Sequence, residues 1–487
     1  MLCCAFWCSG AGRRLGVALM GAWALTGVQA APATQAQWPA PVQAALERAQ
    51  LPRDAVSVWV ADAAGGAPRL AHRAQVPMNP ASVMKLVTTY AGLELLGPAY
   101  VWQTPVYIDG PVRSGTLHGN VYVRGQGDPK MVMERLWLLL RRLQGQGIRH
   151  IAGDIVLDQS AFVLPTHDPA AFDGEPLRPY NAAPDALLLN FKAVVLNLGP
   201  DQAAGVARVQ MDPPLAGVQV PATVPLAPAG TACGDWRANL RADWSDAHRV
   251  VLRGAYPAAC GERSWAVAYA DPARYAQRAV EGMWHELGGQ LTGTVRYGTV
   301  PRHLEPAWVA TSPPLAEVVR DINKYSNNVM AQQLWLTLGW QQHGVGTPEN
   351  AREAVRQWWR ARWGDADFPA MDNGAGLSRQ NRITAQSLAR MLQAAWASPV
   401  MPELLASLPV TGVDGTLRRS RASARAHLKT GSLRDVAAIA GYVHAADGRR
   451  YVLVAVVNHA QAAAARPVFD ALVEWTAQAQ RPDAGSP

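Results

Sequence analysis

The residues best suited to chemistry are a serine and a lysine three positions apart, Ser82 and Lys85, in the sequence Ser-Val-Met-Lys. On a helix this spacing puts both side chains on one face, one turn apart, where they can hydrogen-bond. A lysine whose pKa is lowered by burial or by a neighbouring cation can take the serine proton as the serine oxygen attacks a carbonyl carbon. The pair predicts acyl transfer through a serine nucleophile, although the same spacing also arises by chance on a core helix.

Lysine is rare in this chain of 487 residues: 45 residues are basic, and only five of these are lysine. A lysine that is kept in a sequence rich in arginine can have a role that arginine cannot fill. Lysine can release its proton near neutral pH when its pKa is lowered, and arginine cannot. Two of the five lysines, Lys85 and Lys429, fall in motifs of catalytic character. Both are therefore candidate site residues.

A second polar motif, Ser326-Asn327-Asn328, lies where one helical pattern over 315–324 gives way to another. Residues two positions apart do not share a helical face, so Ser326 and Asn328 can converge on a ligand only from a turn between helices. From such a turn Ser326 can relay a proton to a leaving amine, and Asn328 can bind a substrate amide. Taken alone, the motif would be interpreted as a helix cap.

A third motif, Lys429-Thr430-Gly431-Ser432, is predicted to start an edge strand. Glycine allows a substrate backbone to approach closely and to pair as an added strand. Lys429, Thr430 and Ser432 offer donors to a free carboxylate. The backbone N–H groups of Ser82 and Ser432 can then form an oxyanion hole.

The elements that position Ser82 are predicted from the pattern around it. From about Val56 to Leu70 the pattern indicates two strands joined by a turn. Asn79 is a suitable N-cap, Pro80 fits the first helical turn, and apolar residues at helical spacing continue until Gly97. We therefore expect Ser82 in the first turn of a helix, where the helix N-terminus favours negative charge.

The elements around Lys429 come from the last third of the chain. Helical patterns dominate again from Leu315. Two apolar strands, Val436 to His444 and Arg450 to Asn458, flank an Asp-Gly turn and predict a hairpin. A last helix from about Arg466 to Gln480 is expected to pack its apolar residues on a sheet rather than on a membrane.

The stretch between these two regions has another character. It contains short strand-like runs such as Val121 to Val123, an amphipathic helix near Met133 to Leu143 and a proline-rich segment over 213–228. This pattern predicts one or two inserted modules. Three of the five cysteines lie within the first 30 residues, which have the pattern of an export signal, and only Cys233 and Cys260 remain. An even pair in an exported protein favours a disulfide, and two buried free thiols are the alternative.

Residues 1–30 have the pattern of that signal: two arginines, an apolar run over 15–25 and a small-x-small cleavage site before Ala31. We expect the mature protein in the periplasm. The net charge is +8, but the basic residues are spread along the chain and form no long run, so nucleic-acid binding has little support. No later stretch approaches about 20 apolar residues, which leaves only peripheral membrane contact. No metal or nucleotide fingerprint is found, so no metal and no cofactor are expected.

The three motifs resemble the Ser-x-x-Lys, Ser-x-Asn and Lys-Thr-Gly set of penicillin-binding proteins and serine β-lactamases. Because a long insert separates Ser82 from Ser326, the chain resembles in particular the D-Ala-D-Ala carboxypeptidase/endopeptidase family that contains type-4 penicillin-binding proteins. It departs from the family at Asn327, where many relatives have aspartate, and at Asn373 and Ala375, which replace aspartate and serine. Further stretches that fit the family are Gly127 to Pro129, Tyr180 to Asn190, the cysteine pair, Gly376 to Arg379 and Gly415 to Leu417.

The resemblance implies an α/β (α+β) fold. A β-lactamase/transpeptidase-like domain, with an antiparallel sheet flanked by helices, is expected over residues 31–101 and 302–487. Residues 102–301 are expected to form an inserted region of two smaller, mainly-β domains, one nested in the other.

The resemblance also assigns roles. Ser82 is expected to be the nucleophile, Lys85 the general base, and Ser326 the proton relay. The residues expected to bind substrate are Asn328, Lys429, Thr430, Gly431 and Ser432.

The implied activity is hydrolysis of D-alanyl bonds in peptidoglycan peptides, as a carboxypeptidase or an endopeptidase, with β-lactams as inhibitors. A serine β-lactamase is the nearest alternative, although the Glu-x-x-Leu-Asn segment of one lactamase type is missing between Ser326 and Lys429. A catalytically idle wall-binding scaffold is an alternative from another class. Labelling with a fluorescent penicillin distinguishes the idle scaffold from the two enzymes.

Overall fold

The computed structural model describes residues 38–478. The predicted export signal, 1–30, lies outside the described residues, as does Gln480 at the predicted end of the last helix. Within the described part of the chain, no helix combines the length and the apolar character needed to cross a membrane.

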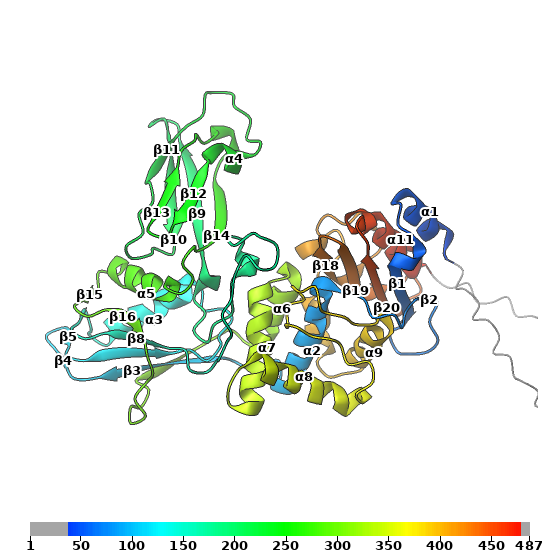
Figure 1. The fold of residues 1–487 in the computed structure, drawn as a ribbon, viewed down its shortest axis with the longest axis horizontal. Helices are drawn as coiled ribbons and strands as arrows, with labels where there is room; N and C mark the ends of the chain where they lie inside the picture. The colour runs from blue at the N-terminus through cyan, green and yellow to red at the C-terminus, as the bar shows by residue number, and fades with distance from the viewer. Residues whose placement is uncertain (1–37, 479–487) are drawn as a thin grey trace, which may run out of the picture. The chain divides into compact units, whose positions relative to one another are not determined.

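A five-stranded antiparallel sheet brings together the N-terminal and C-terminal strands of the described chain (Figure 1). The strand order is β18-β19-β20-β1-β2. Strand β20 is apolar and buried along nearly its whole length, so both faces of the sheet must be covered. The predicted hairpins β1–β2 and β19–β20 are confirmed. The strands are β1 (Val56–Asp62), β2 (Leu70–His72), β18 (Ala426–Leu433), β19 (Val436–His444) and β20 (Arg450–Asn458).

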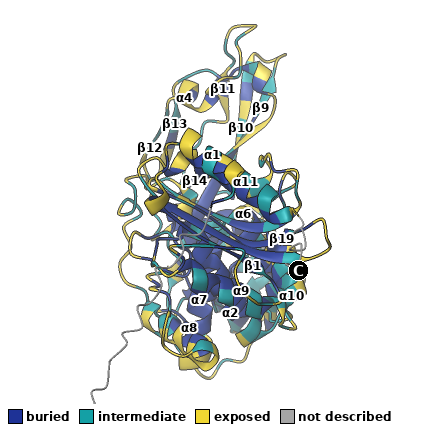
Figure 2. Cartoon of the chain, turned by 90° about the vertical axis from the view of Figure 1, so that its right-hand side faces the viewer, coloured by how far each residue is buried: buried dark blue, intermediate teal, exposed yellow. Residues whose placement is uncertain are grey.

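Helices cover both faces of this sheet (Figure 2). Helices α1 and α11 pack together on one face, and α11 contacts β19 and β20. Helix α9 contacts β20 and β1 on the other face, where α2 packs against α6, α7 and α8. The packing of α11 on the sheet confirms the prediction for the last helix. The helices are α1 (Ala40–Arg48), α2 (Lys85–Leu96), α6 (Leu315–Tyr325), α7 (Asn328–His343), α8 (Pro348–Trp363), α9 (Ala385–Trp396), α10 (Met401–Ser407) and α11 (Arg466–Ala477).

The inserted region contains a first group of strands and helices built on two sheets, ordered β16-β8-β6-β3-β17 and β15-β7-β5-β4. The predicted strand at Val121 to Val123 and the predicted helix from Met133 are both confirmed, as β6 and α3. The elements are β3 (Gln103–Asp109), β4 (Val112–Arg113), β5 (Thr116–Leu117), β6 (Asn120–Arg124), α3 (Met133–Gly145), β7 (His150–Ile151), β8 (Ile155–Asp158), α5 (Tyr275–Glu286), β15 (Gln290–Leu291), β16 (Val295–Tyr297) and β17 (Trp308–Thr311).

A second group is contained within the first along the chain. It has a four-stranded sheet, ordered β11-β10-β9-β14, and the two-stranded sheet β12-β13. Each group has its own cluster of buried apolar residues. We therefore propose that the inserted region comprises two domains, one nested in the other. The region was predicted over 102–301, but β17 lies after residue 301 and pairs with β3, so we propose that it extends to Thr311. The elements of the second group are β9 (Ala193–Asp201), β10 (Val206–Asp212), β11 (Thr223–Pro225), α4 (Trp236–Leu240), β12 (Ala242–Asp246), β13 (Arg249–Leu252) and β14 (Arg263–Ala268).

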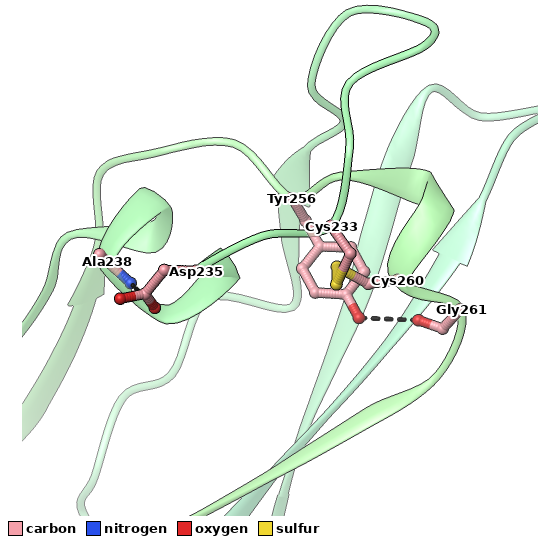
Figure 3. The surroundings of a disulfide bond; sticks show 6 residues. All are labelled: Cys233, Asp235, Ala238, Tyr256, Cys260 and Gly261. Atoms are coloured by element: carbon pink, nitrogen blue, oxygen red, sulfur yellow. Dashed lines mark hydrogen bonds between the residues drawn. A yellow bond between two sulfur atoms is a disulfide. The ribbon is translucent and has the colours of Figure 1, made fainter.

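The disulfide between Cys233 and Cys260 lies in this second group (Figure 3), so the predicted pairing is confirmed. Cys260 is buried in the apolar cluster of the group, next to Tyr256. The Tyr256 hydroxyl donates a hydrogen bond to Gly261 O at 2.7 Å, just after the second cysteine. The disulfide therefore links two segments of the chain around a small apolar core, which has few other residues to stabilise it.

Candidate active site

The α-helix that was predicted to contain Ser82 begins after that residue. The expected α-helix from Asn79 is instead a 3-10 turn over Ala81–Met84, and α2 begins at Lys85. Ala81 has a φ of 47°, in the left-handed region that an α-helix cannot contain. The Asn79 side chain still accepts a hydrogen bond from Ala81 N at 2.9 Å. Ser82 consequently lies in a turn ahead of the α-helix.

Two close backbone contacts explain this departure. A Cβ atom at Gly431 would clash with Pro80 O, and one at Gly376 would clash with Ala81 O. Strand β18 and the loop at Gly376 therefore press directly on the backbone beside Ser82, which only glycine permits. Tertiary contacts override the local preference for a regular helix start.

Lys85 is completely buried and its side-chain nitrogen contacts groups from all sides of the site. Its Nζ is 2.9 Å from Ser82 Oγ, 2.6 Å from Asn328 Oδ1 and 2.6 Å from Ala375 O. Burial, and then the charge of Lys429, lower the pKa of Lys85 well below its usual value. A neutral Lys85 has a lone pair that can accept the proton of the Ser82 hydroxyl.

Ser326 and Asn328 occupy the junction between α6 and α7, as the sequence predicts. Ser326 ends α6 with a left-handed φ of 57°, and the Asn327 side chain caps α7 by accepting from Met330 N. Asn328 Nδ2 donates to Tyr180 O at 3.2 Å, so a segment of the inserted region supports the amide.

Lys429 is the second buried lysine of the site. Its Nζ donates to Ser326 Oγ at 2.9 Å and to Thr430 O at 2.6 Å. Burial lowers its pKa to about 7. Strand β18 is an edge strand, as predicted, but Lys429 is its fourth residue and not its start. The strand begins earlier because Ala426 to Leu428 also pair with β19.

The rest of the third motif lies along the same strand. Thr430 Oγ1 donates to Thr416 Oγ1 at 2.7 Å, which joins the strand to the Gly415 segment. Gly431 is buried against Pro80, and the Ser432 side chain is exposed. The structure thus brings the three motifs together. The first residues of β18 pair at its outer edge with the Val410 segment, whereas from Lys429 onward no other strand of the described chain pairs with that edge, which leaves it open to an extended peptide.

The backbone oxygen of Ala375 is a site atom that the sequence did not reveal. Asn373 Oδ1 accepts hydrogen bonds at 3.0 Å from both Ala375 N and Gly376 N, and its Nδ2 donates to Leu377 O. This network shapes the loop that presents Ala375 O to Lys85. Because the contact uses a main-chain atom, the residue type at 375 carries no signal for it. The one signal in the sequence is Asn373, because an asparagine side chain often hydrogen-bonds to the backbone of the loop that contains it.

Comparison with known proteins connects this geometry to a family. Residues 39–479 match the model of the "D-Ala-D-Ala carboxypeptidase 3 (S13) family". A D-alanyl-D-alanine carboxypeptidase of Actinomadura sp. (strain R39) is 29% identical over 431 residues, which are 84% of this chain and 78% of that protein. The D-alanyl-D-alanine carboxypeptidase DacB of Haemophilus influenzae is 25% identical over 396 residues, which are 78% of this chain and 80% of that protein.

A solved structure supports the fold assignment. The crystal structure of penicillin binding protein 4 from Haemophilus influenzae has a TM-score of 0.71 and 21% sequence identity to this chain. The match covers 90% of this chain and 99% of that one. The predicted transpeptidase-like α/β fold is therefore confirmed.

Proposed function

The chain belongs to the D-Ala-D-Ala carboxypeptidase 3 (S13) family, and we propose that it hydrolyses D-alanyl bonds of peptidoglycan peptides through an acyl-enzyme on Ser82. The observation that carries this proposal is the 2.9 Å contact between the buried Lys85 Nζ and Ser82 Oγ. We also propose a periplasmic location, in keeping with a cell-wall substrate.

Acylation begins when Lys85 takes the proton of the Ser82 hydroxyl and the freed oxygen attacks the carbonyl carbon of the penultimate D-alanine. The backbone N–H groups of Ser82 and Ser432 are the proposed donors to the oxyanion that forms. Lys85 pairs with no carboxylate among the described residues, and burial lowers its pKa, which favours the neutral form that accepts a proton.

The leaving amine then takes a proton as its bond to the carbonyl carbon breaks. Ser326 is the proposed relay, since its Oγ is 2.9 Å from Lys429 Nζ. Water next attacks the ester, Ser82 recovers its proton, and the shortened peptide leaves. Each cycle therefore consumes one water and releases one amine and one acid.

Substrate recognition is proposed to use the edge of β18. The peptide backbone pairs along the strand at Gly431, and its terminal carboxylate meets Lys429, Thr430 and Ser432. Asn328 is proposed to bind a substrate amide. A β-lactam presents the same carboxylate and a strained amide, so it should acylate Ser82. A structure of the Haemophilus influenzae relative is described as a complex with a β-lactam.

Digestion of purified muropeptides tests the proposed function. We expect the enzyme to release free D-alanine from pentapeptide muropeptides, to split cross-linked dimers, or both, as measured by chromatography of the products. Prior treatment with penicillin should abolish either reaction, because the acyl-enzyme blocks Ser82. An enzyme that leaves muropeptides intact but turns over penicillin rapidly would be a β-lactamase, and one that does neither would be a scaffold.

The lowered pKa of Lys429 predicts the pH dependence of the reaction. Lys429 is protonated below its pKa of about 7 and loses its charge as the pH rises through that value. We therefore expect kcat/KM for a peptide with a free carboxylate to fall above about pH 7, approaching tenfold per pH unit. The same peptide with a terminal carboxamide should show no such fall, because it has no anion to bind. An equal fall for both peptides would contradict the carboxylate-binding role of Lys429.

A further inference from the structure

Two hydroxyl groups meet at the edge of β18, where the substrate carboxylate is proposed to bind. Thr430 Oγ1 lies 2.7 Å from Thr416 Oγ1, and within the described chain neither hydroxyl hydrogen-bonds to any other side chain. Thr416 is exposed and Thr430 is half-buried, so a ligand can reach this pair. Thr416 lies outside the three motifs and has no part in the reaction described above.

The segment that carries Thr416 is fixed to the end of α6. Lys324 Nζ is 2.6 Å from Asp414 Oδ2, and the other oxygen of this carboxylate accepts a backbone N–H at 2.9 Å. The Lys324 side chain is largely buried, and the backbone of Gly415 packs against Lys324 O, where a Cβ atom would clash. Lys324 lies two positions before Ser326, so one short stretch of chain positions both Ser326 and the Thr416 segment.

The same segment is also fixed to the start of β18. Thr411 N donates to Ala426 O at 3.1 Å, and Ala426 N donates back to Thr411 Oγ1 at 3.1 Å. The loop that carries Thr416 is therefore held both by α6 and by the strand that carries Thr430. Because the loop is ordered in the free enzyme, no further entropy is lost in bringing the two hydroxyls together when a ligand binds.

A threonine hydroxyl has a single proton, which limits what Thr430 can offer to a ligand. In the free enzyme Thr430 donates this proton to Thr416. An ionised carboxylate only accepts hydrogen bonds, so Thr430 must turn its proton away from Thr416 to bind one. The Thr416 hydroxyl can then rotate and donate to the Thr430 oxygen. A hydroxyl that accepts a hydrogen bond is a stronger donor, because hydrogen bonds in a chain polarise one another.

We propose that Thr416 is a positioning residue for the substrate carboxylate: by donating to the Thr430 oxygen, it directs the Thr430 proton to the ligand. This role rests on the proposed function and adds to it a residue outside the three motifs. No covalent bond forms or breaks, because the two hydroxyl groups only rotate. Thr416 should therefore favour ligands with a free carboxylate over ligands in which the carboxylate is blocked.

Acylation by a matched pair of ligands tests this role. Benzylpenicillin has a free carboxylate and its methyl ester has none, and stopped-flow measurement gives the second-order rate constant of acylation for each. We expect the carboxylate-to-ester ratio of these constants to fall about three- to tenfold in Thr416→Val, which removes one hydrogen bond. Valine has the shape of threonine and the position is exposed, so the fold should be retained. Thr416→Ser keeps the hydroxyl and should restore most of the ratio.

Two further variants show where the hydroxyl of Thr416 acts. Thr292→Val removes the hydroxyl of another exposed threonine, which lies 2.7 Å from His150 Nε2 in the inserted region, and it should leave the ratio unchanged. Thr430→Val removes the group through which Thr416 is proposed to act. Adding Thr416→Val to Thr430→Val should therefore lower the ratio no further.

The outcomes separate this role from the proposed function. A general loss of structure would slow acylation by both ligands alike and leave their ratio unchanged, and thermal unfolding shows whether each variant is folded. A wild-type ratio in folded Thr416→Val, or a further fall when that change is added to Thr430→Val, would overturn the role of Thr416. Acylation of the wild type would still uphold the acyl-enzyme. A wild type that neither ligand acylates would overturn the proposed function and the role of Thr416 with it.

Discussion

Replacing Ser82 by alanine is expected to remove all covalent labelling by a fluorescent penicillin and to lower hydrolysis of D-alanyl peptides by about 10³-fold or more. The variant keeps Lys85 and the edge strand but has no oxygen to form the acyl bond. The half-buried hydroxyl makes one side-chain hydrogen bond, to Lys85, so the fold should be retained. Gel fluorescence measures the labelling, and product chromatography measures the hydrolysis.

Ser264→Ala serves as the matched control for this variant. Ser264 is an exposed serine of β14 whose hydroxyl donates to Asn197, far along the chain from the three motifs. It should label at the rate of the wild type. If Ser82→Ala labelled as strongly as the wild type, the nucleophile would have to be another residue and the proposed acyl-enzyme would be wrong.

Replacing Lys85 by arginine is expected to slow acylation by penicillin by about 10²- to 10⁴-fold, the usual contribution of a general base. Arginine supplies a positive charge and hydrogen-bond donors, but it does not release its proton near neutral pH and so cannot accept one. The substitution therefore separates a lysine that accepts a proton from one that only supplies charge. Stopped-flow measurement of the acylation rate gives the result directly.

Two further variants support the interpretation of Lys85→Arg. Lys130→Arg changes a lysine that pairs with Asp321 at 2.6 Å near the surface, and it should acylate normally. Lys85→Met removes both base and charge and should be as slow as Lys85→Arg, while thermal unfolding shows whether either variant is folded. Acylation at the wild-type rate in folded Lys85→Arg would rule out Lys85 as the base.

The two buried lysines account for how one small site holds both a base and a cation. Burying a charged lysine without a carboxylate costs several kcal/mol, and a second charge nearby raises that cost. The cost is reduced when Lys85 is neutral, which suits proton transfer from Ser82. When Lys85 is neutral, only burial disfavours the charged form of Lys429. Its pKa of about 7 leaves Lys429 partly charged near neutral pH, so it can bind a carboxylate.

Much of the fold followed from local patterns. The two apolar runs and the Asp-Gly turn between them predicted β19 and β20 with the bounds that the structure has. The change of helical register at Ser326 predicted a turn there, because side chains two positions apart cannot share a helical face. Such signals depend on neighbours in the sequence, so they can be interpreted without a structure.

The conformation around Ser82 could not be predicted in this way. Its local pattern indicates a regular helix start, yet the backbone of Gly431 and Gly376 forces a left-handed residue just before it. The same holds for Ala375, whose main-chain oxygen binds Lys85 whatever its side chain is. Contacts between distant backbone segments have no signature in the residues that make them.

The sequence by itself determined which groups the site would contain: a hydroxyl, two rare lysines, an amide and an edge strand. Only the tertiary structure decided how those groups behave. Lys85 meets Asn328 across 243 positions and Ala375 across 290, and these contacts place it in a fully buried setting. The pKa of a lysine depends on its burial and on nearby charges, and both arise only when distant segments pack together.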